Sequence, residues 1–101
     1  MRHMMVRFKV HKDKVDTTKK VIVEFVDAVK ENEPATILYQ SYQEHQDECS
    51  FVHFMIFESE EAQTIHRKSS YVKKFVQLLY PLCDGEPVFT NLGLVSRNQP
   101  F

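Results

Sequence analysis

The sequence has no tryptophan, and its 101 residues include only two glycines and two cysteines. Gly85 and Gly93 form no glycine-rich loop, which argues against a nucleotide site, because such loops bring backbone amides to a phosphate. Cys49 and Cys83 have neither CxxC nor metal-ligand spacing. We therefore expect free thiols in a reducing cytoplasm, with a disulfide between them as the alternative.

The chain also lacks an excess of charge of either sign and a long hydrophobic run. Thirteen Lys and Arg against fourteen Asp and Glu leave a formal net charge of −1. The chain therefore lacks the excess of positive charge that binds nucleic acid or anionic lipid. The longest uncharged apolar run, residues 51–57, is far shorter than the ~20 residues of a membrane helix, and no signal-like segment precedes it. We expect a soluble, unsecreted protein that binds neither nucleic acid nor membrane.

The length predicts one domain, because 101 residues can bury one core but not two. We expect residues 5–96 to form it and residues 97–101 to be a C-terminal tail. Residues 1–4 are expected to be either disordered or vector-derived, and they carry no weight in the fold prediction.

Hydrophobic periodicity predicts four strands, which are residues 5–10, 36–43, 51–57 and 88–95. Three segments between them have helical spacing. The first is capped by Asp16 or Thr17 and ends near Asn32, the second is capped by Ser59, and the third follows Ser69 and Ser70. The order β-α-β-β-α-α-β predicts an α+β, ferredoxin-like split βαβ fold with a four-stranded antiparallel sheet.

The third predicted strand, FVHFMIF, carries bulky apolar groups on both faces. One layer of helices covers only one face of a sheet, so the other face needs a partner. We expect a homodimer that packs sheet against sheet. RNA-recognition modules share this topology, but the basic, aromatic glycine motif of their third strand is missing here.

Two histidines are candidates for chemistry. His66, on the second predicted helix, could orient a substrate oxygen or move a proton near neutral pH, or it could simply hydrogen-bond a neighbour. His53, in the third strand, is either a satisfied interface residue or a polar spot in a pocket. No histidine pair has the i, i+4 spacing of a helical metal site, so we expect no metal.

The aromatic content is high, with eight Phe and four Tyr. These side chains could line a cavity for a planar organic ligand, with Tyr39, Tyr42 or Tyr71 as hydroxyl donors. Ordinary core packing is the alternative explanation.

Several motifs between Val6 and Val95 resemble those of the antibiotic biosynthesis monooxygenase family of dimeric α/β barrels. They are Glu33-Pro34, Tyr39 and Tyr42, FMIFESEEAQTIH, Ser70-Tyr71, Phe75 and LLYPLCDGEPVF. Ala62 and His66 stand where the family's helix typically carries Ala and His. The chain departs from the family pattern where Gly, Glu and Trp are usual, at Ala35, Met55 and Phe57.

The resemblance implies a small monooxygenase that needs no metal, flavin or haem and lets dioxygen meet a small aromatic, quinol-type substrate in a dry pocket. His66 would be the catalytic proton acceptor or oxyanion partner. The residues that would contact the substrate are Phe57, Phe75, Tyr71 and His53. The haem-degrading branch typically has a Trp at the position of His66 and a His at that of Val76, so no haem is expected.

Two alternatives remain open on the same scaffold. One is a dimeric barrel that binds a small molecule, or only dimerises, without turnover. The other is an isomerase or a degrader of a small signalling molecule.

Overall fold

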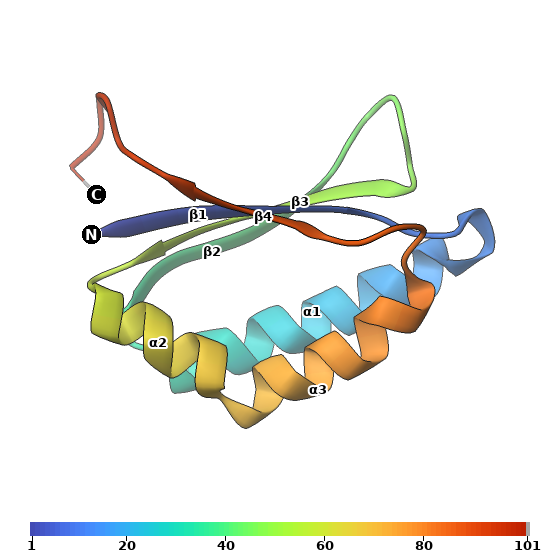
Figure 1. Cartoon of the computed structure of the whole chain (residues 1–101), viewed down its shortest axis with the longest axis horizontal. Helices are drawn as coiled ribbons and strands as arrows, with labels where there is room; N and C mark the ends of the chain where they lie inside the picture. The colour runs from blue at the N-terminus through green and yellow to red at the C-terminus, as the bar shows by residue number, and fades with distance from the viewer. Residues whose placement is uncertain (101) are drawn as a thin grey trace.

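The computed structural model describes residues 1–100 and contains four strands and three α-helices (Figure 1). In chain order they are β1 (Arg2–Lys9), α1 (Val15–Asn32), β2 (Thr36–Gln43), β3 (Ser50–Phe57), α2 (Glu60–Lys68), α3 (Ser70–Leu79) and β4 (Val88–Leu92). Short 3-10 turns, Lys12–Lys14 and Tyr80–Leu82, precede α1 and follow α3. The strands pair antiparallel in the order β2-β3-β1-β4. The predicted α+β, ferredoxin-like fold is confirmed, with β1 and β3 at its centre.

The first and last strands of the chain, β1 and β4, have different limits from those predicted. β1 begins at Arg2, because Arg2 pairs with Phe57 at the far end of β3, so residues 2–4 belong to the sheet and are not a disordered segment. β4 ends at Leu92 rather than at Val95. Leu92 pairs with His3, next to the first residue of β1, so later residues have little of β1 left to pair with.

Helix caps agree with the predictions in α2 and α3 but not in α1. The Ser59 side chain accepts a hydrogen bond from Ala62 N, and the Ser69 side chain accepts one from Val72 N. The predicted cap at Asp16 or Thr17 is wrong, because the 3-10 turn at residues 12–14 leads directly into α1 with no side-chain cap. α1 ends at Asn32, as the following Pro34 predicts.

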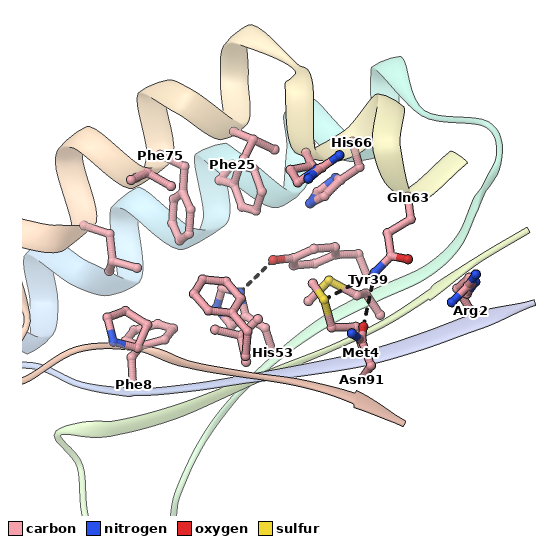
Figure 2. A pocket seen from close by; sticks show the side chains of 18 of the residues that line it. Arg2, Met4, Phe8, Phe25, Tyr39, His53, Gln63, His66, Phe75 and Asn91 are labelled. Carbon is pink, nitrogen blue, oxygen red and sulfur yellow. Dashed lines mark hydrogen bonds between the residues drawn. The ribbon is translucent and has the colours of Figure 1, made fainter. Parts of the chain in front are cut away.

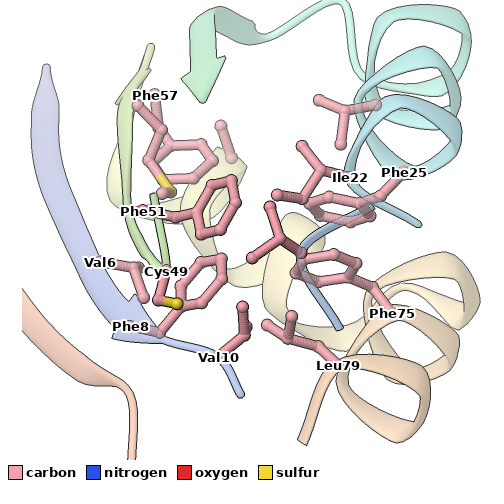
Figure 3. Close-up of a cluster of buried hydrophobic side chains, with 14 residues drawn as sticks. Val6, Phe8, Val10, Ile22, Phe25, Cys49, Phe51, Phe57, Phe75 and Leu79 are labelled. Carbon is pink, nitrogen blue, oxygen red and sulfur yellow. The ribbon is translucent and has the colours of Figure 1, made fainter. Parts of the chain in front are cut away.

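All three helices lie on one side of the sheet (Figure 1), and the core fills the space between the two layers (Figure 3). In β3 the odd-numbered residues face the helices, and Phe51 stacks on Phe8 of β1 with ring centroids 5.5 Å apart. Across the gap, Phe25 of α1 stacks on Phe75 of α3 at 4.1 Å. Each such buried side chain contributes about 1.5–3 kcal/mol relative to exposure in water.

The other face of the sheet carries an apolar strip without a helix over it (Figure 1). Val52, Phe54 and Ile56 of β3 lie on this face, beside Leu38 of β2 and Met5 of β1. Val52, Phe54, Leu38 and Met5 are only half-buried.

A β-bulge in β2 decides which of its side chains face the helices. The register with β3 shifts between Thr36 and Leu38, so Ile37 is an extra residue. Thr36 opposes Phe57 and Tyr39 opposes Met55, although an unbroken period of two would send Thr36 and Tyr39 to opposite faces. The bulge therefore directs both hydroxyl-bearing side chains toward the helices.

Both cysteines are free thiols, and Cys49 is buried. Among residues 1–100, no helix combines the length and the hydropathy that a membrane span requires.

Candidate functional site

A cavity of about 510 Å³ lies between the helix-facing side of the sheet and the three helices (Figure 2). Most of its wall is apolar or aromatic: Met4, Val6, Phe8, Phe25, Met55, Val72, Phe75, Val76, Leu79 and Phe89. The main polar groups are Tyr39, His53 and His66, with Arg2, Glu60, Gln63, Thr64, Arg67 and Asn91 toward one end. This is the composition of a site for a small, largely apolar molecule with a few oriented polar atoms.

His66 lines the cavity from α2 and is hydrogen-bonded to a buried carboxylate. Its Nδ1 lies 2.8 Å from Oε1 and 3.0 Å from Oε2 of Glu33. Both residues are 6 % exposed. Glu33 comes directly after α1, where Pro34 ends the helix, and it is not part of the cavity lining. The carboxylate therefore contacts His66 from behind.

Two hydroxyl groups complete the surroundings of the Glu33 carboxylate. Thr36 Oγ1 donates a hydrogen bond to Glu33 Oε1 at 2.6 Å, and the Tyr71 hydroxyl donates one to Glu33 Oε2. Burial and this carboxylate raise the pKa of Tyr71 to about 12, so the phenol keeps its proton. These hydrogen bonds take the place of the water that a buried carboxylate loses.

The contact with Glu33 selects the tautomer of His66. Both carboxylate oxygens face Nδ1 as hydrogen-bond acceptors, so Nδ1 carries a proton and Nε2 of the neutral ring is a free acceptor. Burial lowers the pKa of His66 below its usual value, and the charge and hydrogen bond of Glu33 oppose that shift. The ring is therefore neutral near pH 7, with the lone pair of Nε2 available as a base.

A second polar pair lies deeper in the cavity, between β2 and β3 (Figure 2). The Tyr39 hydroxyl and His53 Nδ1 are 2.8 Å apart, and His53 is 1 % exposed. His53 Nε2 is buried and has no hydrogen-bond partner within residues 1–100. Burial lowers the pKa of His53 to about 4, and burial also raises the pKa of Tyr39. Both groups are neutral near pH 7.

The structure brings three of the five predicted site residues into the cavity wall: His66, His53 and Phe75. Phe57 and Tyr71 lie behind the wall. Phe57 is 0 % exposed, and its ring centroid is 5.1 Å from that of His66. Tyr71 contacts Glu33 rather than the cavity. These two residues are thus placed to support the imidazole and its carboxylate.

Sequence reasoning missed Glu33 and the specific role of Tyr39. Glu33 was noted only as part of the Glu33-Pro34 motif, although a glutamate at a helix end beside proline was the available signal. Its partner, His66, is 33 residues away, so no local pattern joins them. The placement of Tyr39 depends on the bulge at Ile37.

Polar groups at the α2 end of the cavity form contacts between the layers. Arg2 of β1 makes an exposed ion pair with Glu60 at 2.8 Å. Gln63 Nε2 approaches Asn91 Oδ1 of β4 at 3.4 Å (Figure 2). Within the described part of the chain, no three His, Cys, Asp or Glu side chains gather as a metal site would require.

The family model described as Antibiotic biosynthesis monooxygenase matches residues 1–78. The chain belongs to the antibiotic biosynthesis monooxygenase family. No curated protein matches it.

Solved structures of the antibiotic biosynthesis monooxygenase family have the same fold. A protein of Caulobacter crescentus assigned to this family is 25% identical, with a TM-score of 0.88 over 94% of this chain and 90% of that one. One of Nitrosomonas europaea is 14% identical, with a TM-score of 0.86 over 95% of this chain and 100% of the other. One of Deinococcus radiodurans is 13% identical, with a TM-score of 0.86 over 100% of this chain and 99% of the other.

This member of the antibiotic biosynthesis monooxygenase family combines an imidazole, a carboxylate behind it and a mainly apolar cavity. Such an arrangement can remove a proton from a bound hydroxyl group and hold the resulting anion away from water. Met55, one of its departures from the family pattern, lines the cavity, and Phe57, another, packs against His66.

Proposed function

We propose that the protein is a cofactor-independent monooxygenase that acts on a small aromatic quinol. The observation that carries this proposal is the buried Glu33–His66 pair, whose imidazole lines a cavity of about 510 Å³ with mainly apolar walls. Membership of the family and the shared fold support the same class of activity.

The chemistry needs no bound cofactor, because the substrate itself supplies the electrons. With 1,4-dihydroxynaphthalene as the example, one oxygen atom of O2 enters a ring C–H bond next to a hydroxyl carbon. The other atom leaves as water, and the product is 2-hydroxy-1,4-naphthoquinone. The ring gives up the four electrons that reduce O2, so atoms and electrons balance.

His66 would begin the reaction by accepting the hydroxyl proton at Nε2. The naphtholate that forms is a much stronger electron donor to O2 than the neutral quinol. Glu33 would stabilise the imidazolium through its hydrogen bond to Nδ1, as carboxylates do for catalytic histidines. Phe75 would form part of the wall against the ring of the substrate.

The functional unit that we propose is a homodimer joined through the open faces of two sheets. The half-buried strip of Leu38, Val52 and Phe54 is apolar, and covering it would remove exposed hydrophobic surface from water. The family relationship favours the same assembly. The buried free thiol of Cys49 fits a reducing compartment, and we propose the cytoplasm.

Oxygen uptake with 1,4-dihydroxynaphthalene, measured above the enzyme-free rate, tests the proposed activity. We expect His66→Ala to lower turnover by about 10²-fold while the fold is retained, since the variant loses its acid-base group. His45→Ala, in the exposed β2–β3 loop, is the matched control and should retain full activity. Binding of the quinol without oxygen uptake by the wild type would support a non-catalytic binding protein instead.

A further inference from the structure

His53 and His66 present their Nε2 atoms with different hydrogen-bonding roles. His66 Nδ1 contacts a carboxylate, which requires a proton on Nδ1 and leaves Nε2 as an acceptor. His53 Nδ1 instead contacts a phenol, which can either donate or accept. The state of His53 Nε2 therefore depends on the direction of the bond to Tyr39.

The direction of the Tyr39–His53 hydrogen bond follows from how many polar groups each arrangement leaves without a partner. If the Tyr39 hydroxyl donates to His53 Nδ1, the phenol proton is satisfied, and within residues 1–100 the Nε2–H of His53 is the one group of this pair left unpaired. If Nδ1–H donated to the phenol oxygen, the phenol proton of the half-buried Tyr39 would also need an acceptor, and the structure shows no other partner for it within residues 1–100. Unpaired buried polar groups are costly, so the first arrangement is favoured.

We propose that His53, held in its Nε2–H tautomer by Tyr39, binds an oxygen acceptor of an aromatic substrate, at a position separate from the proton acceptor His66. The observation that points to a ligand is His53 Nε2, which is buried at the cavity wall and has no hydrogen-bond partner within residues 1–100, because buried polar groups are normally paired.

Three aromatic side chains hold the His53 ring in place, and they also indicate which kind of ligand fits beside it. Phe8 meets the imidazole edge-on at 5.1 Å between centroids, and Phe75 stacks nearly parallel to it at 5.8 Å. Tyr39 meets it edge-on at 5.5 Å. The donor is thus rigid and uncharged, and its neighbours are flat aromatic rings. This combination suits the carbonyl or ring oxygen of a planar aromatic compound better than a phosphate or a metal ion.

The inference rests on the proposed function and narrows its substrate class. The substrate would carry at least two oxygens, one a hydroxyl whose proton goes to His66 and the other an acceptor for the Nε2–H of His53. A quinol that becomes a hydroxyquinone keeps oxygens at both places during the reaction. His53 would therefore determine orientation and specificity, and His66 would remain the base.

The tautomers can be measured directly on the wild-type protein. Long-range ¹H–¹⁵N correlation spectra distinguish an imidazole protonated at Nε2 from one protonated at Nδ1. At pH 7 we expect His53 to be in the Nε2–H form and His66 in the Nδ1–H form. Assignment of His53 to the Nδ1–H form would overturn the proposal, and this measurement requires no substrate, turnover or variant.

Binding of two matched probes tests the ligand class. The first is 2-hydroxy-1,4-naphthoquinone, which has carbonyl oxygens, and the second is 2-naphthol, which has the same ring system and a hydroxyl but no carbonyl. We expect His53→Phe to weaken binding of the quinone by about tenfold, the usual scale for one lost hydrogen bond, and to change binding of 2-naphthol by less than about twofold. His53→Gln keeps an amide N–H donor and should retain most of the preference.

Three further results would count against the inference. They are equal losses for both probes in His53→Phe, wild-type affinity for the quinone in that variant, and binding of neither probe by the wild type. Should His53→Phe fail to fold, Tyr39→Phe replaces it, and we expect a mixed tautomer at His53 together with weaker quinone binding. Since none of these measurements involves oxygen uptake, an absence of turnover would contradict the proposed activity alone.

Discussion

Glu33 Oε1 lies 2.8 Å from His66 Nδ1, although 33 residues separate the two in the chain. The residue directly after α1 supplies the carboxylate, and the last turns of α2 supply the imidazole. Because both groups are buried, their interaction is weakly screened, and the carboxylate opposes the lowering of the His66 pKa that burial causes. A change at Glu33 should therefore alter the protonation of His66.

We expect Glu33→Gln to reduce quinol turnover by about 10²-fold, because the amide can hold Nδ1 but cannot stabilise an imidazolium. Glu33 raises the pKa of His66, so its loss should also move the acidic limb of the pH–rate profile to lower pH. Oxygen uptake over a range of pH measures both effects. The control is Glu24→Gln, in an exposed ion pair with Lys74, and it should change neither. A full-rate Glu33→Gln enzyme would refute the assigned role.

Tyr71→Phe should lower the free energy of unfolding by about 1–3 kcal/mol, because the buried carboxylate of Glu33 loses a hydrogen-bond donor. Urea denaturation followed by circular dichroism measures the change. Tyr80→Phe alters an exposed tyrosine and should stay within about 0.5 kcal/mol of the wild type. Equal stabilities of the two variants would argue that the Tyr71 hydroxyl does not support Glu33.

Stability should decrease as the pH falls from 7 to 5. The unfolded chain takes up a proton at His53 near pH 6.5, whereas the folded chain resists it until a pKa of about 4. The unfolded state then binds more protons, so falling pH favours unfolding, by about 2 kcal/mol for this residue over that interval. The lowered pKa of His66 acts in the same direction. Urea denaturation at each pH provides the measurement.

A variant separates the contribution of His53 from that of other groups. His53→Gln has no titrating side chain, so its stability should depend less on pH between 7 and 5 than that of the wild type. His45→Ala removes an exposed histidine and should leave the slope unchanged. An unaltered slope in His53→Gln would show that other groups cause the pH dependence.

Val52→Asp should convert the proposed dimer into folded monomers, because it places a charge in the apolar strip on the open face of the sheet. Sedimentation velocity at micromolar concentration measures the assembly. The matched control is Val23→Asp, on the exposed side of α1, where Val23 is 61% exposed. A wild-type protein that sediments as a monomer would contradict the sheet-to-sheet interface.

Local patterns in the sequence were sufficient for the fold. The alternation of Phe51, His53 and Met55 with their neighbours specifies a strand, and Ser59 and Pro34 mark helix ends by their hydrogen-bonding and steric properties. These signals lie within a few residues of the structure that they produce. Even so, the predicted cap of α1 and the limits of β1 and β4 were wrong, because they depend on pairing with distant strands or on an adjoining turn.

The site was decided by tertiary structure. Both faces of β3 are apolar, so its sequence does not tell which one the helices cover, and only the packed sheet shows that Met55 faces inward and Val52 outward. The extra residue at Ile37 changes the period of β2 and directs Tyr39 to His53. Glu33 reaches His66 only because the helices, packed side by side on the sheet, bring the end of α1 beside α2. Short-range periodicity determines secondary structure, whereas contacts between residues far apart in the chain are determined only when strands and helices are packed together.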